Sequence, residues 1–196
     1  MSTNFAKIPE DTFKEIQMNA GILVGNFDPT DGTVTDILGA TTGGITITAT
    51  PTFIDMGEDV DNCPKNMMEL KKLDSWDIIM SGTYVTVSAD IAKSLLGAAK
   101  VSTSDNKITP KSVLEPTDFK DIWWIGDYSD VNTGDNAGFV AAHMKNALST
   151  GGFQIKSTDK NKGQFAFTYT AHYSIADPDD VPFEVYVKPG TASSEP

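Results

Sequence analysis

The stretch GITITATPTFI, at Gly44–Ile54, alternates between apolar residues and threonines. Successive residues of a strand point to opposite faces, so this period of two predicts a strand with one buried and one solvated face. Pro51 has no backbone N–H to donate, and we expect the far end of this strand to lie at the edge of a sheet. The segment therefore indicates a β protein with a half-exposed sheet.

A second strand is predicted over Trp76–Ser88 (WDIIMSGTYVTVS), separated from the first by a long charged connection. This connection, Asp55–Asp74 (DMGEDVDNCPKNMMELKKLD), has no clean hydrophobic period. Two strands joined in this way form a hairpin with an oversized, projecting loop, which we place at residues 55–75. Large loops on rigid scaffolds commonly contact other molecules. The loop is therefore a candidate interaction site.

One helix is predicted, at about residues 89–97. Ser88 can cap its N-terminus, Asp90 suits its first turn, and Gly97 can end it. Ile91 and Leu95 form an i, i+4 apolar face. A shorter helical turn is expected within Ile8–Ala20, because Pro9, Glu10 and Asp11 stand ahead of Phe13 and Ile16.

The rest of the chain is mainly strand-like. By propensity Phe139–Leu148 favours a helix, but its strand-like neighbours favour a β-meander, and we interpret it as a strand. Asp28–Gly44 and Ser102–Lys111 are expected to be irregular, because turn-forming or polar residues dominate them. The other predicted strands are Ile22–Phe27, Ile122–Tyr128, Phe153–Ser157, Gln164–Ser174 and Phe183–Val187.

These elements predict a mainly β fold, a β-sandwich or partly closed barrel with one flanking α-helix. The expected organisation is an N-terminal arm at residues 1–20, a β domain at 21–189 and a flexible C-terminal tail at 190–196. Hydrophobic residues make up 39% of the 196, enough for a sizeable core.

The charge composition disfavours a dedicated nucleic-acid binder. There are 27 acidic residues against 15 basic ones, which gives a formal net charge of −12. Every basic residue is a lysine. Nucleic-acid readers need a basic surface, and arginine is their preferred contact to phosphate and guanine. An acidic, arginine-free chain lacks both.

The chain offers little for a structural metal, a disulfide or a membrane stage. Its single cysteine, Cys63, excludes an internal disulfide and a Cys-rich zinc site. The first fifteen residues lack the apolar core of a secretory signal, and no apolar stretch approaches the roughly 20 residues of a membrane span. We expect folding in a reducing cytoplasm and no membrane partner.

No catalytic arrangement is recognised. The two histidines, His143 and His172, lie in strand-like runs, and we interpret both as hydrogen-bonded structural residues rather than bases or ligands. The acidic run Asp55–Asn62 could offer oxygen ligands to calcium, but its spacing does not fit an EF-hand, and a solvated loop is the favoured interpretation. We therefore predict no enzyme, and no catalytic, cofactor-binding or metal-binding residues.

Two pairs of neighbours suggest structural roles. Trp123 and Trp124 would face opposite sides of a strand, so they cannot form one carbohydrate-stacking platform. We expect one indole in the core and the other at an interface. Gly151 and Gly152 are expected to hold a hairpin turn with positive φ.

Several segments, taken in order, resemble the major tail protein, or tail tube protein, of long-tailed bacteriophages and prophages of the non-contractile, siphovirus type. One departure is Ala171, which stands before His172 where glycine is expected. The segments that carry the resemblance span most of residues 10–187: Asp11–Ala20 (DTFKEIQMNA), Gly21–Pro29 (GILVGNFDP), Asp55–Pro64 (DMGEDVDNCP), Asp118–Asp130 (DFKDIWWIGDYSD), Lys145–Phe153 (KNALSTGGF), Lys162–Ser174 (KGQFAFTYTAHYS) and Val181–Val187 (VPFEVYV).

The resemblance implies a structural virion protein without a cofactor. Copies would form hexameric rings that stack into a tail tube, with loop 55–75 and the terminal arms contacting neighbouring rings. Tape measure, tail terminator and distal tail proteins would be further partners. Double-stranded DNA would pass through transiently, after assembly in the host bacterial cytoplasm.

Two alternatives remain open from the sequence. One is another β-rich phage subunit, such as a distal tail, connector or capsid decoration protein. The other is a carbohydrate-binding module or a small glycan-active enzyme that uses the aromatic residues. The position of the negative charge is also open: it would either line the channel and repel DNA, or keep an abundant protein soluble before assembly.

Overall fold

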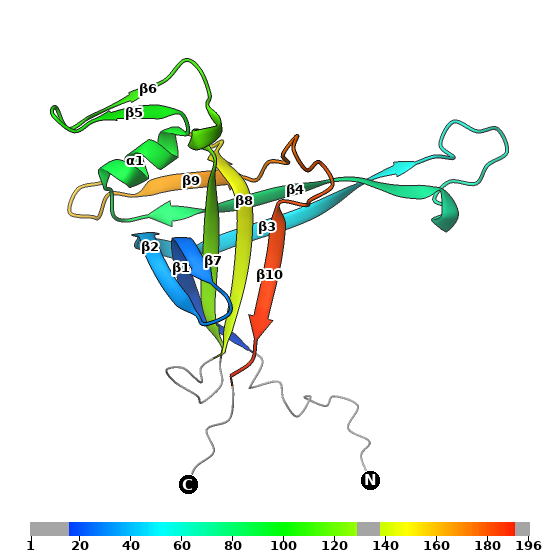
Figure 1. The fold of residues 1–196 in the computed structure, drawn as a ribbon, viewed down its shortest axis with the longest axis horizontal. Coiled ribbons are helices and arrows are strands. Elements are labelled where there is room, and N and C mark those ends of the chain that lie inside the picture. Colours follow the sequence, from blue (N-terminus) through cyan, green and yellow to red (C-terminus); the bar gives the residue numbers. More distant parts are fainter. Residues whose placement is uncertain (1–15, 129–137, 191–196) are drawn as a thin grey trace, which may run out of the picture.

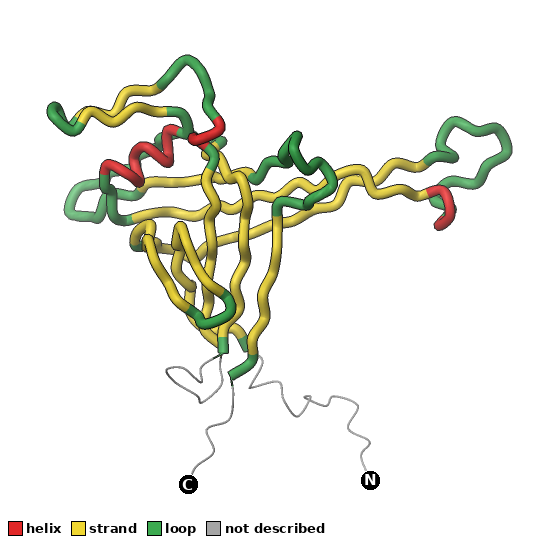
Figure 2. The backbone as a smooth tube through the Cα atoms, viewed as in Figure 1, coloured by secondary structure: helices red, strands yellow, loops and turns green. Residues whose placement is uncertain are grey.

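The computed structural model describes residues 16–128 and 138–190. These residues form a mainly β fold with one α-helix, as the sequence predicts (Figures 1 and 2). The elements in chain order are β1 (Gln17–Asp28), β2 (Thr33–Gly39), β3 (Thr41–Asp55), the 3-10 helix η2 (Met68–Leu70), β4 (Lys71–Tyr84), α1 (Ala89–Leu96), β5 (Ala99–Ser102), β6 (Lys107–Pro110), the 3-10 helix η3 (Pro116–Asp118), β7 (Lys120–Tyr128), β8 (Phe139–Ser149), β9 (Phe165–Thr170) and β10 (Phe183–Lys188).

The strands form two groups that run across one another in Figure 1. One group has the order β2-β1-β7-β8-β10, and the other has the order β3-β4-β9. Strand β8 joins them, because its residues 139–144 pair with β10 while Leu148 and Ser149 pair with β9. The sheet runs from β2 at one end to β3 at the other and does not close into a barrel. β5 and β6 form a separate hairpin.

The main core lies between the two strand groups and beneath α1. Aromatic residues of β4 and β9 meet aliphatic residues of the opposite group there, and Ile91 and Leu95 add the buried face of the helix. Fully burying a side chain of this size contributes about 1.5–3 kcal/mol. The buried members are Leu23, Ile78, Met80, Tyr84, Ile91, Leu95, Ile122, Met144, Ala147, Phe165, Phe167 and Tyr169.

The predicted helix is confirmed with its caps. The Ser88 side chain accepts a hydrogen bond from the backbone N–H of Ile91 at 3.1 Å, and Gly97 occupies the C-cap. The interpretation of Phe139–Leu148 as a strand is also confirmed, since β8 covers Phe139–Ser149. Its alanines are buried between β7 and β10, so neighbouring strands override the helical propensity.

The two adjacent tryptophans face opposite sides of β7, as predicted. Trp123 is buried in a second cluster with Val24 and Phe27, whereas Trp124 is half-buried against the main core. The Trp124 indole N–H donates to the carbonyl oxygen of Ala20 at 3.0 Å. Both indoles therefore contribute to packing within the subunit.

Two segments that we expected to be irregular contain strands. Asp28–Gly44 includes all of β2 and the start of β3, so that prediction was wrong. The turn itself is confined to residues 29–32, where Asp28 and Asp31 accept backbone hydrogen bonds from Thr30 and Thr33. The β-branched residues that follow pair with β1. Ser102–Lys111 was similarly misjudged, since most of it belongs to the β5–β6 hairpin.

Other boundaries also differ from the sequence predictions. Phe153–Ser157 is not a strand and contributes one isolated bridge, Lys156 to Gln164. β9 ends at Thr170, four residues before the predicted end at Ser174. In the expected helical turn Ile8–Ala20, residues 17–20 belong to β1 and the first eight residues lie outside the described part of the chain.

The turn after β8 does not form the predicted hairpin, because the next strand begins only at Phe165, but its two glycines are restricted for different reasons. Gly152 has φ of +69°, which confirms its expected positive φ. Gly151 is not among the positive-φ residues, so that half of the prediction was wrong. A Cβ at Gly151 would instead lie 3.1 Å from the backbone nitrogen of Thr168. The backbone conformation restricts one glycine, and close approach of β9 restricts the other.

Candidate functional site

Strands β3 and β4 extend beyond the body of the protein as a two-stranded ribbon. β4 pairs with β9 only over Ile79–Tyr84, whereas it pairs with β3 from Tyr84 back to Lys71. Residues 51–55 and 71–76 therefore form a ribbon, which projects sideways from the body and ends in a loop (Figure 1). The projection predicted from the sequence is present, but the loop proper is residues 56–70 because Lys71–Ser75 belongs to β4.

The ribbon loop, residues 56–70, has a defined internal structure. The Asp55 carboxylate at its base accepts hydrogen bonds from the backbone N–H groups of Gly57 and Asn66, both at 3.0 Å. Both hydrogen bonds lower the pKa of the Asp55 carboxyl from its usual value, and the one from Asn66 has the larger effect. Gly57 is buried, and a Cβ there would meet the Cys63 sulfur and the Leu70 side chain.

The acidic run Asp55–Asn62 is therefore a loop organised by Asp55. No cluster of three or more His, Cys, Asp or Glu side chains within residues 16–128 and 138–190 could hold a metal ion.

The ribbon and its loop expose apolar side chains on both faces. Phe53 and Leu73 are cross-strand partners, and Ile54 lies opposite Lys72 on the other face. Met68 is 82% exposed. A two-stranded ribbon is marginally stable in water on its own, and contiguous exposed apolar residues mark interaction surfaces. The exposed apolar residues here are Phe53, Ile54, Met56, Val60, Met67, Met68 and Leu73.

The same ribbon leaves a long sheet edge open. β3 has fifteen residues and pairs with β4 on one side only, within the part of the chain that the structure describes. Soluble monomers usually shorten, cover or charge such an edge because its unpaired backbone groups recruit other strands. Between Gly44 and Ile54, β3 carries no charged residue. The part of this edge before Pro51, which has no backbone N–H to donate, is thus suited to strand pairing with another chain.

The outward face of the β3-β4-β9 group is rich in hydroxyl groups. The register places Thr46, Ser81 and Thr168 in one row across the three strands, and Thr48, Ile79 and Thr170 in the next. Partners across a ladder share a face, and Met80 and Tyr169 in the intervening rows point into the core. We call this surface the threonine face: Thr42, Thr46, Thr48, Thr50, Asp77, Ile79, Ser81, Thr83, Ala166, Thr168 and Thr170. Asp77 is its one charged residue.

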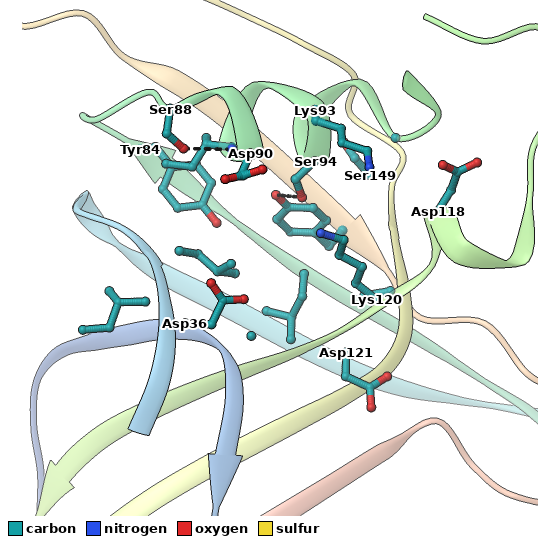
Figure 3. Close-up of a pocket in the computed structure, with 18 residues that line it drawn as sticks. Asp36, Tyr84, Ser88, Asp90, Lys93, Ser94, Asp118, Lys120, Asp121 and Ser149 are labelled. Atoms are coloured by element: carbon teal, nitrogen blue, oxygen red, sulfur yellow. Dashed lines mark hydrogen bonds between the residues drawn. The ribbon is translucent and has the colours of Figure 1, made fainter. Parts of the chain in front are cut away.

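A cavity of about 660 Å³ lies beside α1, against the ends of β2 and β7. Figure 3 shows labelled carboxylates and lysines around it, and the buried Tyr84 and Tyr169 are among its lining residues. The Tyr169 and Ser94 hydroxyls are 2.9 Å apart. Burial raises the pKa of both phenols, so neither would act as a base near neutral pH.

The carboxylates of the cavity do not assemble a catalytic arrangement. The most buried of them, Asp118, is 2.7 Å from the ammonium of Lys111 and also accepts the backbone N–H of Glu115. Among the residues that line the cavity there is no histidine or cysteine.

The two histidines lie in structural surroundings. His143 stacks on Trp123 with ring centroids 3.8 Å apart, and its nitrogens lie 3.3 Å from Asp121 and 3.4 Å from Glu184. These carboxylates come from the two strands that flank β8, so linear spacing could not reveal them. His172 Nδ1 lies 3.3 Å from the carbonyl oxygen of Asn146.

No family model matches the chain, and no curated protein matches it. Similar solved structures include a chain of the virion of a native gene transfer agent (GTA) particle, at 10% identity and a TM-score of 0.39, covering 86% of this chain and 96% of that chain. Another is a chain of the tail of an empty GTA particle, at 11% identity and a TM-score of 0.36, covering 79% of this chain and 92% of that one. Within the described residues, the model contains no helix of the length and hydrophobicity that a membrane span requires.

Proposed function

We propose that this chain is a structural subunit of a phage-type tail and that its copies assemble into a tube of stacked rings. The projecting β3–β4 ribbon carries the proposal. It exposes apolar side chains on both faces and at its loop, where a monomer gains nothing from them. A partner surface would bury this area and supply the stabilisation that an isolated two-stranded ribbon lacks.

The open edge of β3 supports ring formation. Pairing of this edge with a different strand edge of the next copy is a heterologous contact, and such contacts close into rings when the rotation per subunit is right. The edges of β2 and β10 are the candidates within the described residues, since each pairs with one neighbour only. The sequence resemblance implies six subunits in a ring.

The threonine face suits the wall of a DNA conduit. Affinity for DNA comes mainly from lysine and arginine contacts to phosphate, and this face has neither. Hydroxyl groups form hydrogen bonds with water, and they carry no positive charge that would neutralise phosphates. In the proposed tube this face, whose one charge is the negative Asp77, lines the channel and lets double-stranded DNA pass without sticking, while most of the acidic residues lie elsewhere.

The carbohydrate-binding alternative gains no support from the tryptophans. Trp123 is buried, and Trp76 and Trp124 are half-buried, so none of the three indoles offers an exposed stacking platform. The structural-subunit proposal includes the partners that the resemblance implies: copies of itself, the tape measure, tail terminator and distal tail proteins, and DNA in transit. Its location would be the virion, after assembly in the bacterial cytoplasm.

The proposal is tested by replacing the ribbon loop. Asp55 and Lys71 are cross-strand partners, so an Asn-Gly turn can connect them in place of residues 56–70. We expect this variant to keep its circular dichroism spectrum and melting temperature but to sediment as a small species, whereas the wild type pellets as polymer. Equal polymer formation by the two proteins would contradict the proposed role of the ribbon.

A further inference from the structure

The ribbon loop carries a net negative charge, and its carboxylates have no ion-pair partner among residues 16–128 and 138–190. Residues 56–70 include four carboxylates and one lysine, Lys65, for a net charge of −3. None of the four carboxylates forms an ion pair or side-chain hydrogen bond within the described part of the chain. All four are exposed, and they surround the exposed Met56, Val60 and Met68. The four are Glu58, Asp59, Asp61 and Glu69.

The opposite end of the molecule carries the complementary charge. The β5–β6 hairpin and residues 153–163, before β9, both lie at the end of the body far from the ribbon loop (Figure 1). Together residues 99–110 and 153–163 hold five lysines and two aspartates, a net charge of +3. We call this surface the lysine end; its lysines are Lys100, Lys107, Lys156, Lys160 and Lys162.

The lysines of this end are free to meet a partner. All five are exposed, and none forms an ion pair with another residue of the described chain. Exposed apolar residues stand among them, namely Val101, Phe153 and Ile155. Lys111, the next lysine in the sequence after Lys107, differs because it forms ion pairs with Asp118 and Glu115. Both the lysine end and the ribbon loop therefore combine exposed apolar residues with charged ones, but their net charges are opposite in sign.

We propose that the ribbon loop of one copy docks on the lysine end of another copy. The contact would bury the apolar residues of both surfaces while opposite charges meet around them, the arrangement typical of specific interfaces. Because the two surfaces lie at opposite ends of one chain, each copy can give one contact and receive one. Repetition produces a directional, head-to-tail array. This inference rests on the proposed assembly and names the surface that receives the ribbon.

Charge exchange between the two surfaces tests the pairing. One variant carries Glu58→Lys, Asp59→Lys and Asp61→Lys, which changes the loop from −3 to +3. The other carries Lys107→Glu, Lys160→Glu and Lys162→Glu, which changes the lysine end from +3 to −3. Each variant alone brings like charges together, and we expect its pelletable polymer to fall by about tenfold or more, since like-charge juxtaposition costs several kcal/mol. In an equimolar mixture, every contact between the two different variants pairs opposite charges, so an alternating array should restore polymer.

A control separates this pairing from a general effect of net charge. Asp177→Lys with Asp179→Lys adds positive charge at exposed positions outside both surfaces. Introduced into the lysine-end variant itself, these two changes return four of the six charge units that the variant lost, away from the docking surface, and they should not restore polymer. Circular dichroism of every variant establishes that the subunits fold.

The outcomes distinguish the two levels of the proposal. Absence of polymer from the wild type would overturn the proposed assembly itself. Wild-type polymer together with undiminished polymer from either variant would overturn the docking surface alone. Failure of the charge-exchanged mixture, or equal rescue by the control, would overturn the pairing of loop with lysine end.

Discussion

Asp55 closes the loop of the projecting ribbon by accepting a hydrogen bond from the backbone N–H of Asn66, at 3.0 Å and eleven residues further along the chain. Asn66 has φ of +60°, a conformation that asparagine tolerates better than most residues. The same carboxylate accepts a hydrogen bond from the backbone N–H of Gly57. One aspartate at the end of β3 therefore gives a fixed shape to a loop that would otherwise be a flexible excursion.

Asp55→Ala should loosen the ribbon loop without unfolding the subunit. The change removes the acceptor for two backbone donors, so we expect faster hydrogen exchange at the amides of Gly57 and Asn66, and less polymer. Asp179→Ala removes the same charge from an exposed side chain outside both docking surfaces and is the matched control. Equal exchange rates and equal polymer in the two variants would contradict the organising role of Asp55.

The loop should also respond to acid in a defined direction. The folded-state pKa of Asp55 lies below its usual value of 3.8, so its stabilising hydrogen bonds are fully present above that pH. They are lost as the pH falls through the lower folded-state value. Hydrogen exchange at Asn66, corrected for the intrinsic pH dependence of exchange, should therefore lose protection below about pH 3.8 in the wild type. In Asp55→Ala the corrected protection should not change over that range.

A second acid-sensitive contact joins β8 to β10. The Lys145 ammonium lies 2.6 Å from the Glu184 carboxylate and, together with a hydrogen bond from Tyr186, lowers the pKa of that carboxyl from 4.5 to about 2. The stabilisation is present above pH 4.5 and is lost as the pH falls toward 2. In urea unfolding, Lys145→Met should be less stable than the wild type at pH 6, and the difference should shrink by pH 2.5.

The control for this prediction is Lys100→Met, which removes an exposed lysine that has no ion pair within the described residues. Its unfolding midpoint should match the wild type at both pH values. A difference between Lys145→Met and the wild type that stays constant with pH would contradict the assignment.

The hydroxyl contact between Ser94 and Tyr169 should contribute measurably to stability. Tyr169 is buried, and its phenol is 2.9 Å from the Ser94 hydroxyl on α1. Tyr169→Phe keeps the ring and removes this bond, so we expect a loss of about 1 kcal/mol and a melting temperature lower by about 2–4 °C. Tyr173→Phe is a control at an exposed ring. Its phenol accepts the backbone N–H of Trp76, and its loss should cost less.

Substitution of either glycine in the turn after β8 should destabilise the protein, for a different physical reason in each case. Gly152→Ala places a Cβ in open space but at φ of +69°, and the strain should cost about 1 kcal/mol. Gly151→Val brings branched atoms against the Thr168 backbone, which pairs with this turn, and should cost more. Thermal melts of both variants check the order. A more damaging Gly152→Ala would contradict it.

The sequence predicts the elements whose pattern is local. The threonine alternation of Gly44–Ile54 identifies β3, and the cap and apolar face of Ser88–Gly97 identify α1. Two hairpins escaped prediction, around β2 and β5–β6, because turn-forming and polar residues dominate their short strands. In these hairpins a few β-branched residues and pairing with a neighbouring strand outweigh a composition that is typical of loops.

The candidate surfaces were only partly accessible from the sequence. The connection between β3 and β4 is long, charged and without a hydrophobic period, so the sequence alone predicts a projecting loop there. The threonine face depends on the register that sets Thr46 beside Ser81 and Thr168, three segments far apart in the chain. The lysine end likewise combines the β5–β6 hairpin with residues 153–163. Both surfaces depend on strand register and topology, so neither surface can be recognised from a linear sequence motif.

Electron microscopy of the purified wild-type protein tests the central proposal most directly. At concentrations that favour assembly, the protein should form long hollow cylinders of uniform diameter, and averaged cross-sections should show rings of six subunits. The β3–β4 ribbon should bridge adjacent rings. A protein that stays monomeric at high concentration, or forms only small closed oligomers, would contradict the account.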